Sequence, residues 1–349
     1  YINFYIHSNN SLKLILLNQL LKRGTAKINI DLNFDDSGKI KNNYSLTGNV
    51  SNAELQIPKG KSIRNLNFSF NANDKDYKFE KILFKYNQIN FNSNFLKIKK
   101  QKDNFSVKGS LKNKKNKVNN EIIFLILNDN LKNFDFSNTN FESISEFSFD
   151  INKKFKIKNL KVDTRLNLDE LVLKYDLYKI KNYIGNFENL TNLKKNKFHI
   201  KYSDKKITID GSSEFFINPN FINLLEFQIE KSKNKTSFKT FFNLKNLDLK
   251  IHEISYKKPK NNKATLSIQG YVNKKKLFLK NINYKENKNK IIINNLEIIN
   301  NKISNFDEIR FDFLSENDFK NQINLIRKKN NFNLIGKSFD STQLIENIT

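Results

Sequence analysis

The chain has 349 residues, and 62 Lys and Arg against 35 Asp and Glu give it a formal net charge of +27. It contains no Cys, which excludes disulfides, thiolate metal sites and Cys nucleophiles. No run of about 18 apolar residues occurs, so we expect no transmembrane helix within these residues.

The positive charge allows two interpretations. The first is a polyanionic partner, either nucleic acid or an anionic membrane surface. The second is an AT-rich genome, whose codons favour Lys and Asn at solvent-facing positions without selection for a ligand. The second is favoured because the lysines are spread along the whole sequence. We expect no nucleic-acid partner, because Phe and Tyr mostly share the aliphatic face of the predicted strands instead of an exposed basic face.

The first predicted element is a helix over residues 11–23. Its apolar residues have helical spacing, Ser11 can cap its start and Gly24 can end it. Because the chain begins at Tyr1 and contains no Met, we expect it to be a fragment or a processed form of a longer protein.

Residues 26–336 alternate between apolar and polar, as strands do. Ile28 and Ile30, for example, alternate with Lys27 and Asn29. A slip of this alternation near Ser93 and Asn94 predicts a bulge or a turn. We therefore predict one elongated, repetitive β domain over residues 1–349.

Four segments depart from this alternation. Residues 122–127 are continuously apolar and predict either a strand buried on both faces or a short helix. Residues 175–197 have mixed periodicity, which is compatible with a short helix. Residues 219–229 predict a short helical insertion that begins with a proline. Residues 340–348 predict a terminal helix capped by Asp340.

The pattern apolar-x-apolar-x-Gly recurs along the chain. Each glycine has the parity of the apolar residues, so it lies on the apolar face. A glycine there permits a bend, a close approach or a gap for a ligand, and we favour the bend of a curved sheet. The five glycines are Gly48, Gly109, Gly211, Gly270 and Gly336.

Few helices are predicted that could cover a sheet of roughly twenty strands. Open sheets seldom exceed about ten strands without curling or splitting. The predicted fold is therefore all-β, with a long, coiled, mainly antiparallel sheet whose apolar face forms a groove. An apolar surface of that size marks a binding site.

No catalytic constellation is visible. The histidines His7, His199 and His252 lie far apart in the sequence. Two Gly-Lys-Ser triplets lack the first glycine of a phosphate loop. Asp35 and Asp36 fit a turn better than a metal site. We expect no enzymatic activity, no metal and no cofactor.

Residues 38–57 (GKIKNNYSLTGNVSNAELQI) and 333–348 (NLIGKSFDSTQLIENI) resemble segments of the AsmA-like superfamily, in particular its YhdP-like branch in Gram-negative bacteria. The resemblance implies an inner-membrane anchor, expected upstream of this chain, and a β-groove that extends through the periplasm. It also implies phospholipid transport in outer-membrane biogenesis. The implied partners are phospholipid acyl chains, the inner membrane and other envelope proteins.

The leading hypothesis is a periplasmic, bridge-like conduit that shields acyl chains in an apolar β-groove. The alternative is a structural or adhesive envelope protein with a filled core and no ligand. The two differ in whether the apolar face is open or filled. The candidate lining residues are Leu46, Gly48, Val50, Leu55, Phe68, Val107, Gly109, Ile209, Gly211, Ile268, Gly270 and Leu334.

Overall fold

The computed structural model describes residues 20–39, 41, 43–57, 61–118, 134–135, 139–154, 156–173, 183–184, 191–216, 222–274, 276–328 and 331–346. The chain divides into two compact units. Unit 1 comprises residues 1–117, 141–166 and 201–204, and unit 2 comprises residues 118–140, 167–200 and 205–349. Strands β8, β9 and β10 contribute residues to both units.

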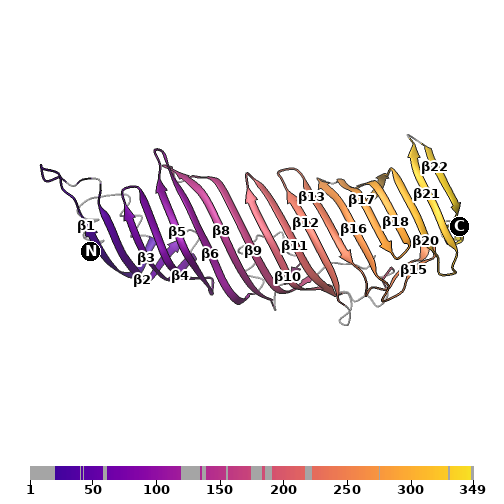
Figure 1. Ribbon diagram of the computed structural model, residues 1–349, viewed down its shortest axis with the longest axis horizontal. Coiled ribbons are helices and arrows are strands. Elements are labelled where there is room, and N and C mark those ends of the chain that lie inside the picture. Colours follow the sequence, from indigo (N-terminus) through magenta and orange to yellow (C-terminus); the bar gives the residue numbers. More distant parts are fainter. Residues whose placement is uncertain are drawn as a thin grey trace. The chain divides into compact units, whose positions relative to one another are not determined.

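Unit 1 is a meander in which consecutive strands pair antiparallel, as Figure 1 shows. Its strands are β1 (Leu21–Asp31), β2 (Ser45–Ile57), β3 (Lys61–Asn73), β4 (Asp76–Tyr86), β5 (Ile89–Lys100), β6 (Asn104–Val118, up to Lys117) and parts of β8 (Thr139–Asn152), β9 (Ile157–Leu173) and β10 (Thr191–Ser203).

Unit 2 continues the antiparallel pattern with β11 to β13 and β16 to β22, and β14 and β15 form a separate two-stranded sheet. Its elements are β7 (Phe134–Asp135), β11 (Lys206–Phe216), β12 (Asn223–Lys231), β13 (Thr236–Asn243), β14 (Leu249–Ile251), the 3-10 helix η3 (His252–Ile254), β15 (Tyr256–Lys258), β16 (Ala264–Asn273), β17 (Lys276–Glu286), β18 (Asn289–Ile299), β19 (Lys302–Asn305), β20 (Glu308–Leu314), β21 (Lys320–Lys328), β22 (Asn331–Ser338) and α5 (Thr342–Glu346).

The strands other than β14 and β15 belong to one 20-stranded sheet. The prediction of an all-β fold with one large, mainly antiparallel sheet is therefore confirmed. The alternation of apolar and polar residues is the physical reason, because it gives each strand one face that must be covered and one that faces water.

Asparagine takes the place that glycine usually has in the tight turns. Asn87 and Gln88 have φ values of 46° and 69°, and Asn300 and Asn301 have 49° and 62°. Two successive residues with positive φ give a turn whose twist matches that of the flanking strands. Asparagine tolerates this backbone region better than most residues, which explains how a chain with 9 Gly forms so many hairpins.

Of the bulge or turn predicted near Ser93 and Asn94, the structure shows an irregularity within the pairing of strand β5. The pairing of β5 with β6 shifts register between Asn92 and Leu96, which spans the slip at Ser93 and Asn94. A second irregularity lies in β2 between Val50 and Ala53. An extra residue in one strand bends it and increases its local twist.

The predicted helix over residues 11–23 is wrong at its C-terminal end, and residues 11–19 lie outside the described residues. Leu21 to Arg23 begin strand β1 and pair with β2, where Arg23 opposes Glu54. The guanidinium of Arg23 lies 3.0 Å from the Glu54 carboxylate. Backbone pairing with a neighbouring strand has overridden the helical spacing, as tertiary context commonly does.

The predicted helix over residues 219–229 is also wrong from residue 223 onward. Residues 223–229 lie in β12, which pairs with β11 on one side and β13 on the other. Leu225, Phe227 and Ile229 are half-buried and alternate with exposed residues, which is the period of a strand.

The other irregular segments are described only in part. Residues 122–127 lie outside the described residues. Of residues 175–197, the last seven belong to β10. Near the C-terminus, helix α5 covers five residues inside the predicted 340–348. A carboxylate oxygen of Asp340 accepts a hydrogen bond from the backbone N–H of Thr342 at 3.1 Å.

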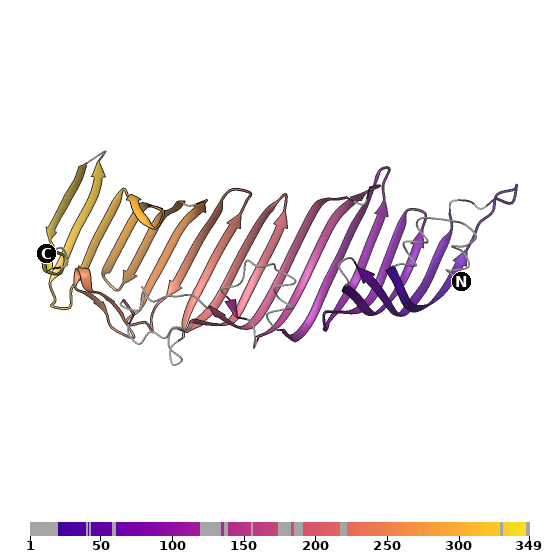
Figure 2. The ribbon, with the colours of Figure 1, turned by 180° about the vertical axis from the view of Figure 1, so that it is seen from behind.

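A hydrophobic cluster lies in each unit. Among the described residues of unit 1, one buried cluster contains Ala53, Leu66 and Ile82. In unit 2 the connection between β13 and β16, residues 244–263, packs against one face of the sheet and is visible in Figure 2. The buried residues of this core are Phe215, Leu244, Leu247, Ile254, Tyr256, Ala264, Tyr284, Ile291 and Phe313.

Candidate functional site

The candidate lining residues of unit 1 lie on one face of its sheet. Residues directly opposite each other on antiparallel strands point to the same side. Val50 is opposite Phe68 and Leu55 is opposite Ile63, whereas Leu46, Gly48, Val107 and Gly109 fall in two neighbouring rows across β1 to β6. The first row is Ile28, Gly48, Phe70, Phe79, Leu96 and Gly109, and the second is Ile30, Leu46, Ala72, Tyr77, Ile98 and Val107.

The candidates of unit 2 are likewise brought together by the register of β11 to β22. Gly211, Ile268 and Leu334, which are far apart in the sequence, belong to one row. Ile209 and Gly270 belong to the next row, through Ile229 and Phe238. The first row is Gly211, Phe227, Thr240, Ile268, Ile282, Ile293, Ile309, Leu325 and Leu334.

Part of this apolar face is filled by the protein's own side chains. In unit 1, Val50, Leu55 and Phe68 pack against the core, and Val107 is only 4% exposed. In unit 2, Tyr284 and its cross-strand neighbours Leu266 and Ile291 pack against residues 244–263. The filled parts behave as a conventional core.

Another part of the face in unit 2 is only half-covered. We call Ile268, Ile282, Ile293 and Ile309 the isoleucine row. All four side chains are half-buried, and none of them belongs to the core cluster found among the described residues of unit 2. Leu334, at the end of the same row, is 66% exposed. The isoleucine row is therefore the best candidate for an apolar binding surface.

The five glycines of the repeat do not leave a gap for a ligand. A Cβ at Gly109 would lie 2.6 Å from Phe147 Cζ, and one at Gly211 would lie 2.3 Å from Phe227 Cζ. At Gly48, Gly270 and Gly336 a Cβ would meet the backbone oxygen of a paired strand within 2.4 Å. Neighbouring rings and backbone already occupy these spaces, which favours close approach over ligand contact.

The opposite face of the same strands is polar. Asn281 donates to Asn294 at 2.8 Å, and Asn294 donates to Glu308 at 2.8 Å. Asn324 donates to the other oxygen of Glu308 at 2.9 Å. This ladder of side-chain hydrogen bonds crosses β17, β18, β20 and β21, so the two faces of the sheet in unit 2 differ in chemistry.

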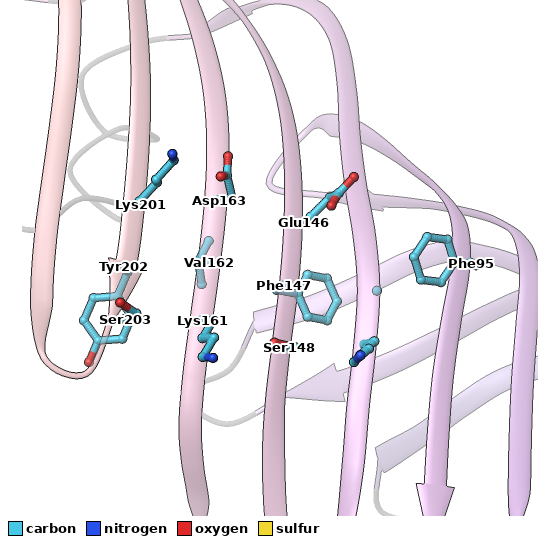
Figure 3. A pocket seen from close by; sticks show the side chains of 12 residues that line it. Phe95, Glu146, Phe147, Ser148, Lys161, Val162, Asp163, Lys201, Tyr202 and Ser203 are labelled. Atoms are coloured by element: carbon cyan, nitrogen blue, oxygen red, sulfur yellow. The ribbon is translucent and has the colours of Figure 1, made fainter.

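Unit 1 has a shallow depression of about 400 Å³ across β5, β6, β8, β9 and β10. In Figure 3, Glu146, Asp163 and Lys201 lie along one line across three strands. These three side chains are exposed, and the lining includes neither His nor Cys. The lining residues are Phe95, Lys108, Gly109, Glu146, Phe147, Ser148, Lys161, Val162, Asp163, Lys201, Tyr202 and Ser203.

Asp35 acts in a turn, as predicted. Its carboxylate accepts hydrogen bonds from the Ser37 hydroxyl at 2.6 Å and from the backbone N–H of Lys39 at 2.9 Å. These bonds hold the pKa of Asp35 below its ordinary value. Among the described residues, no group of three His, Cys, Asp or Glu side chains could hold a metal ion. Within the same part of the chain, no helix has the length and apolar character needed to cross a membrane.

No pattern in the sequence predicts the buried polar cluster that unit 2 contains. The hydroxyl of Tyr256 donates to Glu286 and lies 2.8 Å from the hydroxyl of Tyr284. Asn262 and Asn289 also donate to Glu286, at 2.7 and 3.0 Å. Burial raises the pKa of both tyrosines. The cluster ties residues 244–263 to strand β17.

Lys258 completes this attachment. Its side chain is fully buried, and its amino group donates to the carbonyl of Leu247 at 2.5 Å and to that of Pro259 at 3.1 Å. Burial lowers the pKa of Lys258, and the nearby Glu286 opposes that shift. Because the amine donates to backbone carbonyls on residues 245, 247 and 259, these hydrogen bonds hold the loop in place.

Comparisons of the chain with protein-family models, with curated proteins and with solved structures find no match. The functional argument therefore rests on the geometry of the two faces.

Proposed function

We propose that the half-covered apolar face binds lipid acyl chains, and that the chain is a segment of a conduit that carries phospholipid between the inner and outer membranes. The observation that carries this proposal is the isoleucine row. Its side chains continue from strand to strand across β16, β17, β18 and β20. A continuous apolar strip with incomplete cover is the surface that an acyl chain requires.

The energetics of this surface suit a conduit. Removing one CH₂ group from water contributes about 0.8 kcal/mol, so an acyl chain that covers several strands would bind well. The side chains in the isoleucine row are all aliphatic and present no polar group that would fix a lipid at one position. A lipid could therefore slide along the row while its headgroup stays in water.

The periplasmic location and the membrane anchor are part of the proposal and rest on the resemblance of residues 38–57 and 333–348. The alternative is an envelope protein with a structural or adhesive role. The filled parts of the face, beneath residues 244–263 and around Ala53, favour that alternative. The isoleucine row is where the two hypotheses differ.

The test is to purify the chain from a bacterial host and record its bound lipids by native mass spectrometry. In the variant Ile268→Asp, the new carboxylate lies in the isoleucine row, where partial exposure permits it to remain hydrated. We expect this variant to stay folded and to lose most of its bound phospholipid. The matched control is Gln269→Asp, which places the same charge on the opposite, exposed side of the same strand.

A third variant calibrates the effect of a charge in a true core. Phe313 is 0% exposed, so Phe313→Asp should unfold unit 2 by burying an unpaired charge. The lipid proposal fails if the wild-type chain carries no phospholipid, or if Ile268→Asp unfolds as Phe313→Asp does. In either case the row is a packed core.

A further inference from the structure

Two lysine-rich turns lie side by side at one end of the strands in unit 1. The turn between β5 and β6 and the turn between β8 and β9 meet through an ion pair of 3.0 Å between Asp103 and Lys153. Strands β6 and β8 are paired in the sheet, which explains why their turns are neighbours. We call the lysines of these two turns and of the strand ends beside them the basic tip: Lys99, Lys100, Lys102, Lys153, Lys154, Lys156 and Lys158.

The composition of the chain does not account for this cluster. Residues 99–103 and 152–158 together make twelve residues, of which seven are lysine. The average of the chain, 62 Lys and Arg in 349 residues, would place about two basic residues there. An AT-rich genome raises the overall lysine content but does not select which turns are brought together.

Little negative charge balances the basic tip. Besides the pair with Asp103, Lys99 lies 3.9 Å from Asp76. The other five lysines form no ion pair in the part of the chain that the structure describes. All seven side chains are exposed. The basic tip is thus a concentrated cationic surface in water.

The turns that present these lysines are held in defined conformations. The side-chain oxygen of Asn152 accepts hydrogen bonds from the backbone N–H groups of Lys154 at 3.0 Å and Lys156 at 2.9 Å. Across the other turn, Gln101 N–H donates to the Asn104 carbonyl at 2.8 Å. A preorganised surface loses less conformational entropy when it binds.

An exposed apolar side chain lies beside these lysines in the sequence. Ile157 is 57% exposed and stands at the start of β9, between Lys156 and Lys158 in the chain. Basic residues next to an exposed aliphatic side chain match the interface of an anionic bilayer, where the charges meet the headgroups and the apolar group enters the acyl boundary. A nucleic acid would use the lysines but has no matching use for an aliphatic side chain in this position.

We propose that the basic tip docks unit 1 onto an anionic lipid bilayer. This interaction surface is distinct from the apolar face, and its existence does not depend on the binding of acyl chains there. If both proposals hold, the tip places the sheet against a membrane from which phospholipid is taken or to which it is delivered.

The experiment measures flotation of the purified chain with two kinds of vesicle, one of phosphatidylcholine and one that also contains phosphatidylglycerol. The wild-type chain should float with the anionic vesicles. In the sample with neutral vesicles it should stay in the soluble fraction. Added salt should weaken the binding to the anionic vesicles. Replacing Lys100, Lys102, Lys154 and Lys156 together by Gln should lower the affinity on the order of 100-fold.

A matched variant removes the same net charge elsewhere. Lys231, Lys233, Lys288 and Lys302 are exposed in turns of unit 2 or at the strand ends beside them, and their joint replacement by Gln should lower the affinity less than about threefold. The change Ile157→Ser should also weaken vesicle binding, by about tenfold, without reducing the affinity for a single-stranded oligonucleotide.

Two results would overturn the proposal. Equal loss of affinity in the two quadruple variants would show that only the total charge matters. Tighter binding to the oligonucleotide than to anionic vesicles, with no effect of Ile157→Ser, would assign the tip to nucleic acid. Native mass spectrometry of the quadruple Gln variant of the basic tip separates this test from that of the acyl-chain proposal. The variant should lose vesicle binding but keep the same amount of bound phospholipid as the wild-type chain.

Discussion

At the scale of single residues, Tyr256 shows how one buried side chain holds the covering segment of unit 2 to its sheet. Its ring packs edge-on against Tyr284 and Phe313, and its hydroxyl donates to Glu286. Removing the hydroxyl leaves the ring packing in place and takes one hydrogen-bond donor from the buried Glu286 carboxylate. The resulting loss of unfolding free energy therefore measures the contribution of this hydrogen bond alone.

We predict that Tyr256→Phe lowers the free energy of unfolding at neutral pH by about 1.5–3 kcal/mol, the usual contribution of a hydrogen bond to a charged group. Urea unfolding monitored by circular dichroism measures it. The control is Tyr271→Phe, a half-buried tyrosine whose ring stacks on Phe278. A loss of similar size in both variants would contradict a specific role of the Tyr256 hydroxyl.

The same residue predicts the response to alkaline pH. Burial raises the folded-state pKa of Tyr256 and Tyr284 above 10.0. Below about pH 10 both states keep these protons, and above it only the unfolded state releases them, so stability falls as pH rises. The lowered pKa of Lys258 acts in the opposite sense at somewhat lower pH. Tyr256→Phe should make the decline between about pH 10 and pH 12 shallower in urea titrations, and an unchanged slope would contradict the assignment.

Gly211 shows why the glycines of the repeat are needed. The ring of Phe227 lies over it from the neighbouring strand, where a Cβ would be 2.3 Å from Cζ. We predict that Gly211→Ala costs about 1–3 kcal/mol of stability, because the ring must leave its place.

A double-mutant cycle checks this explanation of the glycine. Phe227→Leu shortens the side chain that covers Gly211, so the cost of Gly211→Ala should be smaller in that background. Thermal or urea unfolding of the four proteins supplies the coupling energy. Additive effects would mean that Gly211 is required for a reason other than the aromatic ring.

At the scale of elements, each strand depends mainly on its neighbours in the sequence. Strand β22 pairs with β21, whereas β17 lies between β16 and β18. The edge strand also exposes Phe332, Leu334 and Ile335. Its backbone hydrogen bonds are therefore shielded on one side only, so local opening there costs less free energy.

We predict that amides of β22 exchange with deuterium at least about tenfold faster than those of β17 under native conditions. Hydrogen exchange followed by mass spectrometry resolves the two strands. Strand β12 is the control, because it is as short as β22 but has partners on both sides. Equal protection of β22 and β17 would indicate that unit 2 opens only as a whole, or that another chain covers the edge.

At the scale of the whole molecule, the net charge of +27 is not evenly distributed, because the fold gathers some of the lysines into one surface. Most lysines are spread along the sequence. The basic tip is the exception, because its two turns lie fifty residues apart in sequence (Asp103 and Lys153) and meet only in the sheet. A sequence count treats these lysines like all others, whereas the fold makes them one surface.

The amino-acid sequence by itself determined the class of the fold. Alternation with a period of two, which Ile207 and Ile209 illustrate, is a local property, and so is the tolerance of asparagine for tight turns. The sequence also determined which residues of a strand share a side, as Leu46, Gly48 and Val50 do in β2, because parity within each strand decides which side a residue takes.

Only the tertiary structure decided which candidates share a row, because register depends on pairing between strands and not on any one of them. It placed Ile268 and Leu334 together, filled the space above the glycines with Phe147 and Phe227, and covered part of the face with residues 244–263. It also turned residues 223–229 into a strand, because paired backbones on both sides stabilise a strand more than helical spacing stabilises a short helix.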